Sequence, residues 1–86
     1  MKIEVCVDSL ESALMAIEAG ADQVELVSQT SVGGLTPSYG LIKALVDRNI
    51  KTMAMVRPRA AGFCYSKYDR EVMLNDCLLY TSDAAD

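Results

Sequence analysis

The sequence has no histidine or tryptophan, and only one phenylalanine and two prolines among its 86 residues. Without histidine, the chain lacks the commonest metal ligand and the side chain that most often serves as a general base near neutral pH. No apolar run approaches the roughly 20 residues that a membrane-spanning helix needs. The acidic Glu4 stands where a secretion signal would carry its apolar stretch. These absences predict a cytoplasmic protein with no membrane partner.

Basic residues and cysteines are also few. Eight lysines and arginines stand against twelve aspartates and glutamates, a formal net charge of −4, and this balance argues against nucleic acid as a partner. The three cysteines (Cys6, Cys64 and Cys77) are an odd number without zinc-type spacing, which argues against a disulfide framework. The glycine-rich nucleotide motifs, GxGxxG and GxxxxGK followed by Ser or Thr, are both missing, so we expect no nucleotide cofactor.

The hydrophobic residues, 51% of the chain, fall into short periodic segments. Alternating patterns predict strands over residues 2–7, 23–27 and 51–57, and apolar residues at helical spacing predict helices over 10–19 and 37–48. Strands that alternate with helices imply an α/β fold with a parallel sheet. Three strands cannot close a barrel, and a doubly wound sheet would also need more chain. The segment is therefore expected to be part of a larger fold of either kind.

Polar residues predict where the two helices begin. Asp8 and Ser9 offer a cap for the first helix, with Glu11 at the spacing of a capping box. Thr36 is expected to cap the second helix, with Pro37 at the first helical position, where its missing N–H costs nothing.

Strand alternation places charged residues together. Alternate residues of a strand face opposite sides, so Glu4, Glu25 and Arg57 are expected on one concave wall of the sheet. Neighbouring carboxylates repel each other, and a guanidinium beside them offsets that repulsion. Two interpretations stay open at this stage: a functional polar site, or a buried salt-bridge network.

A glycine pair and two arginines suggest an anion site. The backbone of Gly33 and Gly34 could cradle an anion at the start of the second helix, although a tight turn explains the pair equally well. Arg57 and Arg59 could hold a carboxylate or a phosphate. These four residues are the candidate substrate-binding set, and Glu4, Glu25, Arg57 and Arg59 are the candidate catalytic set.

Several short blocks in this sequence occur in order and at suitable spacing: Glu4-Val5-Cys6-Val7-Asp8-Ser9, Val24-Glu25-Leu26, Gly33-Gly34-Leu35-Thr36-Pro37-Ser38, Arg57-Pro58-Arg59, and Phe63 with Tyr65-Ser66. In this combination the chain resembles the CutC copper homeostasis family. The resemblance implies the N-terminal βαβαβ(α) portion of a TIM (β/α)₈ barrel, truncated. It also implies a cytoplasmic location and a role in copper tolerance or homeostasis.

The sequence departs from the family at a position that matters for copper. The family often has a cysteine after its Glu-Leu pair, where this chain has Val27. Copper(I) prefers thiolate and thioether ligands, so Cys6 with Met53 or Met55 is the remaining candidate metal site. The alternative is that these sulfur-containing side chains are ordinary core residues.

The last ten residues look different from the rest. A third helix starts near Asp69, and its pattern stops before residues 77–86, which read CLLYTSDAAD. This decapeptide resembles the translation of a sequencing-library adapter, a kind of segment that is not part of the native fold. We therefore expect a CutC-like barrel portion over residues 1–76 and a non-native tail over 77–86, in which Cys77 has no function.

Two functions follow from these residues. The first is copper homeostasis of the CutC type, with a copper ion or small molecule as partner. The alternative is a TIM-barrel enzyme acting on a small anionic metabolite, with Glu4 or Glu25 as acid or base and Arg57 or Arg59 holding the anion. Whether the protein is an enzyme stays open, and a homo-oligomer is one expectation for the full-length form.

Overall fold

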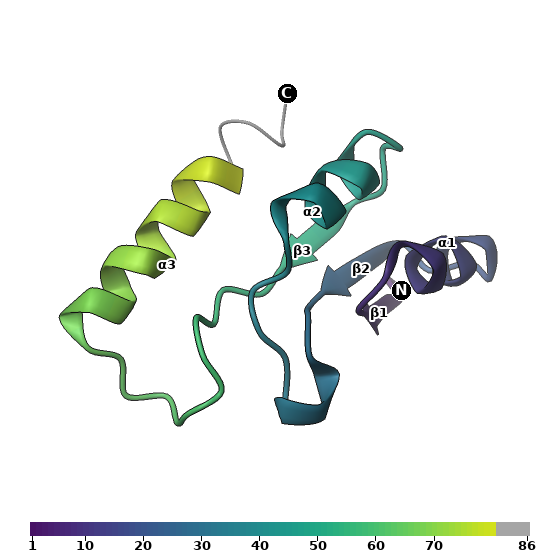
Figure 1. Cartoon of the computed structure of the whole chain (residues 1–86). Helices are drawn as coiled ribbons and strands as arrows, with labels where there is room; N and C mark the ends of the chain where they lie inside the picture. The colour runs from purple at the N-terminus through teal and green to yellow at the C-terminus, as the bar shows by residue number, and fades with distance from the viewer. Residues whose placement is uncertain (81–86) are drawn as a thin grey trace.

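The computed structural model describes residues 1–80 as a three-stranded sheet with helices. The elements in chain order are β1 (Glu4–Val7), α1 (Leu10–Glu18), β2 (Gln23–Leu26), a 3₁₀ turn η1 (Thr30–Val32), α2 (Tyr39–Val46), β3 (Thr52–Ala54) and α3 (Lys67–Leu79). The strands pair in the order β1-β2-β3, and both pairs are parallel. This confirms the predicted parallel α/β arrangement (Figure 1).

The core lies between the sheet and helices α1 and α2. Val24 and Leu26 of the central strand are fully buried, as are Ala13 of α1 and Leu45 of α2. These residues come from one parity of the strands and from the apolar stripe of each helix, which is the pattern that burial of one sheet face produces. The other sheet face is not covered by these helices, and the two faces therefore differ in exposure.

Helix α1 begins at a serine, as expected, but with a different partner. The Ser9 Oγ accepts a hydrogen bond from the Ser12 N–H at 3.0 Å, and the Ser12 hydroxyl closes the capping box at the Ser9 N–H. Glu11, the predicted box residue, lies in the first turn instead. Ser12 fits because it is the third helical residue counted from a cap at Ser9, whereas Glu11 would fit only a cap at Asp8.

The predicted cap of α2 was wrong. Ser38 caps this helix, with its Oγ accepting from the Leu41 N–H at 3.2 Å. Thr36 bonds to the chain after β3 instead: its Oγ1 accepts from the Arg57 N–H at 2.8 Å, and its own N–H donates to the Arg57 carbonyl at 3.0 Å. These two bonds fix the approach to α2 beside the end of β3.

Helix α3 begins earlier and runs further than the sequence suggested. Its cap is Ser66, and it continues to Leu79 rather than stopping before residue 77. The Tyr80 hydroxyl donates to the Pro37 carbonyl at 2.7 Å, and its ring stacks on Tyr39 with 6.3 Å between centroids. This contact places the end of α3 against the start of α2 (Figure 1).

The non-native origin of residues 77–86 stays a prediction, and residues 81–86 lie outside the described residues. Within residues 1–80, every helix is too short or too polar to cross a lipid bilayer.

Candidate functional site

A row of three side chains crosses the sheet on the face away from the helices. In the parallel register Cys6 pairs with Glu25, and Glu25 pairs with Met53 on the next strand. Cys6 is exposed and Met53 is 53% exposed, whereas Val7, Val24 and Leu26, which have the opposite parity, are buried. Glu4 shares this face and accepts a hydrogen bond from the Gln23 side-chain amide of the neighbouring strand. The predicted common face of Glu4 and Glu25 is therefore present.

The Cys6 thiol lies in a negative environment. Although Cys6 is exposed, slight desolvation by the surrounding protein raises the pKa of its thiol, and the charges of Glu25, Asp8 and Glu4 raise it further. The protonated thiol is therefore favoured, because each neighbouring carboxylate opposes a second negative charge. The same carboxylates attract a cation, so a metal ion that displaces the thiol proton would gain from them.

The donor set of this row suits a soft cation in part. Parallel strands lie roughly 4.8 Å apart, so the backbones of β1 and β3 are roughly 10 Å apart, a span that a thiol and a long thioether could close over the central strand. Cys6 and Met53 are soft ligands of the kind that copper(I) prefers, with Glu25 between them. Within residues 1–80 no three His, Cys, Asp or Glu side chains gather as a metal site. A copper ion held in this part of the chain would therefore depend on a thioether beside the thiol.

Arg57 lies at the carboxyl end of the strands, where it links two loops. The residue is 7% exposed. The Nη1 group donates to the Val32 carbonyl at 2.6 Å and to the Gly34 carbonyl at 3.2 Å, and Nη2 donates to the Ala60 carbonyl at 3.0 Å. The Phe63 ring covers the guanidinium carbon, with 4.6 Å to the ring centroid. Arg57 therefore ties the loop after β2 to the loop after β3.

The expected pairing of Arg57 with Glu4 and Glu25 does not form. The two ion pairs within residues 1–80 involve neither glutamate and not Arg57. The reason is that β3 ends at Ala54, so Arg57 has left the sheet and reaches the loop carbonyls instead. Sequence reasoning missed these acceptors because a backbone carbonyl has no residue signature.

Gly33 and Gly34 form a closed turn. Both take left-handed backbone angles, with φ of 87° and 99°, which glycine adopts without strain. The Gly33 N–H donates to the Thr30 carbonyl at 3.1 Å, and the Gly34 N–H donates to the Gln29 carbonyl at 3.2 Å. The two amides are thus engaged within their own loop. This geometry favours the tight turn, and an anion-binding role for the two glycines stays a prediction.

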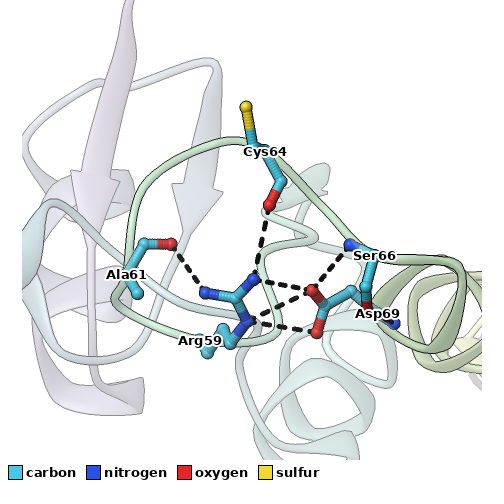
Figure 2. A network of polar contacts seen from close by, with 5 residues as sticks. All are labelled: Arg59, Ala61, Cys64, Ser66 and Asp69. Atoms are coloured by element: carbon cyan, nitrogen blue, oxygen red, sulfur yellow. Dashed lines mark hydrogen bonds and ion pairs between the residues drawn. The ribbon is translucent and has the colours of Figure 1, made fainter.

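Arg59 is held by Asp69 at the start of α3, as Figure 2 shows. Its Nε donates to Oδ1 of Asp69 at 3.1 Å, and its Nη2 donates to Oδ2 at 2.7 Å. Further bonds run to the carbonyls of Ala61 and Cys64, at 3.1 and 3.3 Å. Asp69 also accepts from the Ser66 N–H at 3.0 Å. A role for Arg59 in binding an anionic substrate stays a prediction, and it would require the ligand to compete with Asp69.

This ion pair makes the start of α3 sensitive to acid. The hydrogen bonds from Arg59, and next from Ser66, lower the pKa of Asp69 from its ordinary 3.8 to about 2. Because the folded pKa is the lower one, the stabilisation is present above the ordinary value and is lost as the pH falls through about 2. We expect the Ser66 amide resonance to shift as the pH falls from above 3.8 through about 2 in the unsubstituted chain, and to stay unmoved in Asp69→Asn. Asp47→Asn is the control, since Asp47 pairs with Lys43 on α2. An Asp69 carboxyl that titrates at its ordinary value would contradict the prediction.

Comparisons with known proteins bear on this arrangement. The family model described as the CutC family matches residues 1–85. A family protein CutC from Treponema denticola is 48% identical over 87 residues, covering 100% of this chain and 35% of that protein. One from Pasteurella multocida is 53% identical over 77 residues, covering 88% and 32%. The chain spans about a third of the length of these curated relatives.

A solved structure is similar as well. The crystal structure of a candidate copper homeostasis protein CutC from Streptococcus agalactiae superposes with a TM-score of 0.78 at 32% sequence identity. The match covers 99% of this chain and 40% of that chain. The parallel βα units therefore form part of a TIM-barrel α/β protein. More particularly, the chain belongs to the CutC family.

Proposed function

We propose that this chain serves copper homeostasis as the N-terminal segment of a CutC-type protein that binds copper(I) in the cytoplasm. The observation that supports this most is the row of Cys6, Glu25 and Met53 on the open sheet face. This row offers one soft sulfur ligand on each side of a carboxylate. The Streptococcus agalactiae relative, itself a candidate copper homeostasis protein by name, agrees with this proposal.

The proposed chemistry is ligand exchange without a redox step. Copper(I) replaces the proton of the Cys6 thiol, and the proton is released to water. The Met53 thioether supplies a second soft ligand without any charge. Glu25 lies between the two ligands in the register, and its negative charge offsets part of the charge of the bound ion.

Replacing the thiol tests the proposal directly. Cys6→Ser should weaken copper(I) binding by about tenfold or more, because a hydroxyl is a hard, weak ligand for this ion. The measurement is competition with a copper(I) chelator under anaerobic, reducing conditions. Cys64→Ser is the matched control, since Cys64 is also an exposed thiol but lies in the loop after β3. Equal affinities in the two variants would contradict the proposed ligand.

The alternative, an enzyme acting on a small anionic metabolite, keeps one favourable observation. The buried Arg57 guanidinium has no carboxylate partner within residues 1–80. Within residues 1–80, however, no ion pair or hydrogen bond joins Arg57 to Glu4 or Glu25, so an acid–base pair with a substrate clamp is not assembled in this part of the chain. The catalytic roles of these residues stay predictions.

A further inference from the structure

The charge of Arg57 is buried without a counter-charge. Within residues 1–80 the two ion pairs join Lys43 to Asp47 and Arg59 to Asp69. Arg57 is 7% exposed, and the hydrogen-bond acceptors of its side chain in this part of the chain are all backbone carbonyls. Carbonyl dipoles stabilise a cation, but they do not neutralise it. A buried charge is costly unless it is paired, so this position favours the arrival of an anion.

The Arg57 guanidinium also has N–H groups that donate no hydrogen bond. An arginine side chain has five N–H groups. Nη1 donates two hydrogen bonds and Nη2 donates one, so three of the five groups are engaged. The Nε atom is buried and has no hydrogen-bond partner among the described residues 1–80. The unused N–H groups of Nε and Nη2 sit on nitrogens attached to the same carbon, which is the fork that binds two oxygens of a carboxylate or phosphate.

Glycine keeps room beside this group. A Cβ at Gly33 would lie 3.2 Å from Nη1 of Arg57, which is closer than most such contacts. With its φ of 87° and this close contact, glycine is the residue that lets the loop after β2 approach the guanidinium without strain. The location agrees with a ligand site, because small molecules in parallel α/β folds bind beyond the carboxyl ends of the strands.

A single aromatic ring covers the guanidinium. Phe63 lies over the Arg57 guanidinium carbon at 4.6 Å and is itself 75% exposed. It belongs to the irregular segment between β3 and α3, so its ring can turn away without disturbing a helix or strand. Movement of this one side chain would uncover the charged group.

We propose that Arg57 binds a small oxyanion, a carboxylate or a phosphate, through its unused Nε and Nη2 donors, with Phe63 as a movable cover. This site is separate from the row of Cys6, Glu25 and Met53, and it does not depend on the copper proposal. A result that contradicts one proposal therefore does not affect the other.

The test follows the Nε–H resonances of the arginines in the ¹⁵N-labelled chain. Inorganic phosphate is added in one arm and acetate in another, with sodium chloride at equal ionic strength as the reference. We expect a saturable shift of the Arg57 Nε–H resonance with an oxyanion and none with chloride. The Arg59 Nε–H, already bonded to Asp69, is the internal control and should stay in place. The arm with the lower apparent Kd identifies phosphate or carboxylate as the preferred chemistry.

Two variants complete the experiment. Arg57→Lys keeps the charge but loses the fork, and it should weaken oxyanion binding by about tenfold or more. Because this variant also loses loop contacts, Phe63→Ala provides a second test on an exposed residue. It removes the cover and no donor, so it should keep the oxyanion-dependent shift. An unmoved Arg57 Nε–H resonance in the unsubstituted chain, or loss of the shift in Phe63→Ala, would overturn the proposal.

Discussion

Gly34→Ala is expected to lower the free energy of unfolding by about 3 kcal/mol or more. Gly34 has a φ of 99°, and an added Cβ would lie 2.9 Å from Sδ of Met55 and 3.2 Å from Cβ and Cγ1 of Val27. The left-handed backbone angle costs roughly 1–3 kcal/mol for a residue with a side chain. Overpacking of a buried contact adds roughly 1–3 kcal/mol. Both costs fall on the same substitution.

Urea unfolding of alanine variants at two other glycines distinguishes the backbone cost from the packing cost. Gly20 has a φ of 109° but nothing within 4 Å of the added Cβ, so Gly20→Ala should show the backbone cost alone. Gly40 lies in α2 with open space and no positive φ. Gly40→Ala should stabilise the chain by about 0.5–1 kcal/mol, because alanine is the better helix former. If Gly34→Ala cost no more than Gly20→Ala, the close packing around Gly34 would be refuted.

The parallel sheet was predictable because burial repeats along the chain. Strands β1 and β2 and helices α1 and α2 each bury one face, and the sequence carries that periodicity. The end of β3 was not predictable in the same way. Residues 55–57 look like a strand, but the last ladder bond joins the Met55 N–H to the Leu26 carbonyl, and β2 ends at Leu26. A strand continues only where it has a neighbour, so its end depends on another segment.

The helix caps show a similar limit. Thr36 and Ser38 both have side chains that can cap a helix, and the sequence alone does not choose between them. The choice depends on the two hydrogen bonds between Thr36 and Arg57. These bonds join residues 21 positions apart, so they follow from the tertiary fold rather than from local sequence.

The candidate site was predictable where it lies on strands and unpredictable where it lies on loops. The shared face of Glu4, Cys6 and Glu25 follows from alternation and register. The partners of Arg57 do not, because carbonyl groups occur at every residue. The ion pair between Arg59 and Asp69 could not be predicted from the sequence either, since it depends on where α3 begins.

Val27→Cys is expected to raise the affinity for copper(I) by on the order of 100-fold. Val27 is 2% exposed, yet it lies outside the core cluster beneath the helices, and its parity is that of Glu25. It therefore belongs to the same side of the sheet as Cys6. A Cβ at Gly34 would touch both Val27 and the Met55 sulfur, which shows that these two side chains converge. The substitution adds a soft thiol beside a thioether, at the position where the family often has cysteine.

A matched variant decides whether position or composition produces this gain. Val24→Cys makes the same change in the same strand, but Val24 is fully buried under the helices on the opposite face. Chelator competition in reducing buffer should show tighter copper(I) binding for Val27→Cys and an unchanged affinity for Val24→Cys. Adding Cys6→Ser to Val27→Cys should remove most of the gain, because Cys6 and position 27 lie on the same face, roughly 8 Å apart at their backbones, a span that two thiolates and one copper ion can bridge. Equal gains at positions 24 and 27 would show that any added thiol suffices, and this result would contradict the proposal that the open sheet face binds copper.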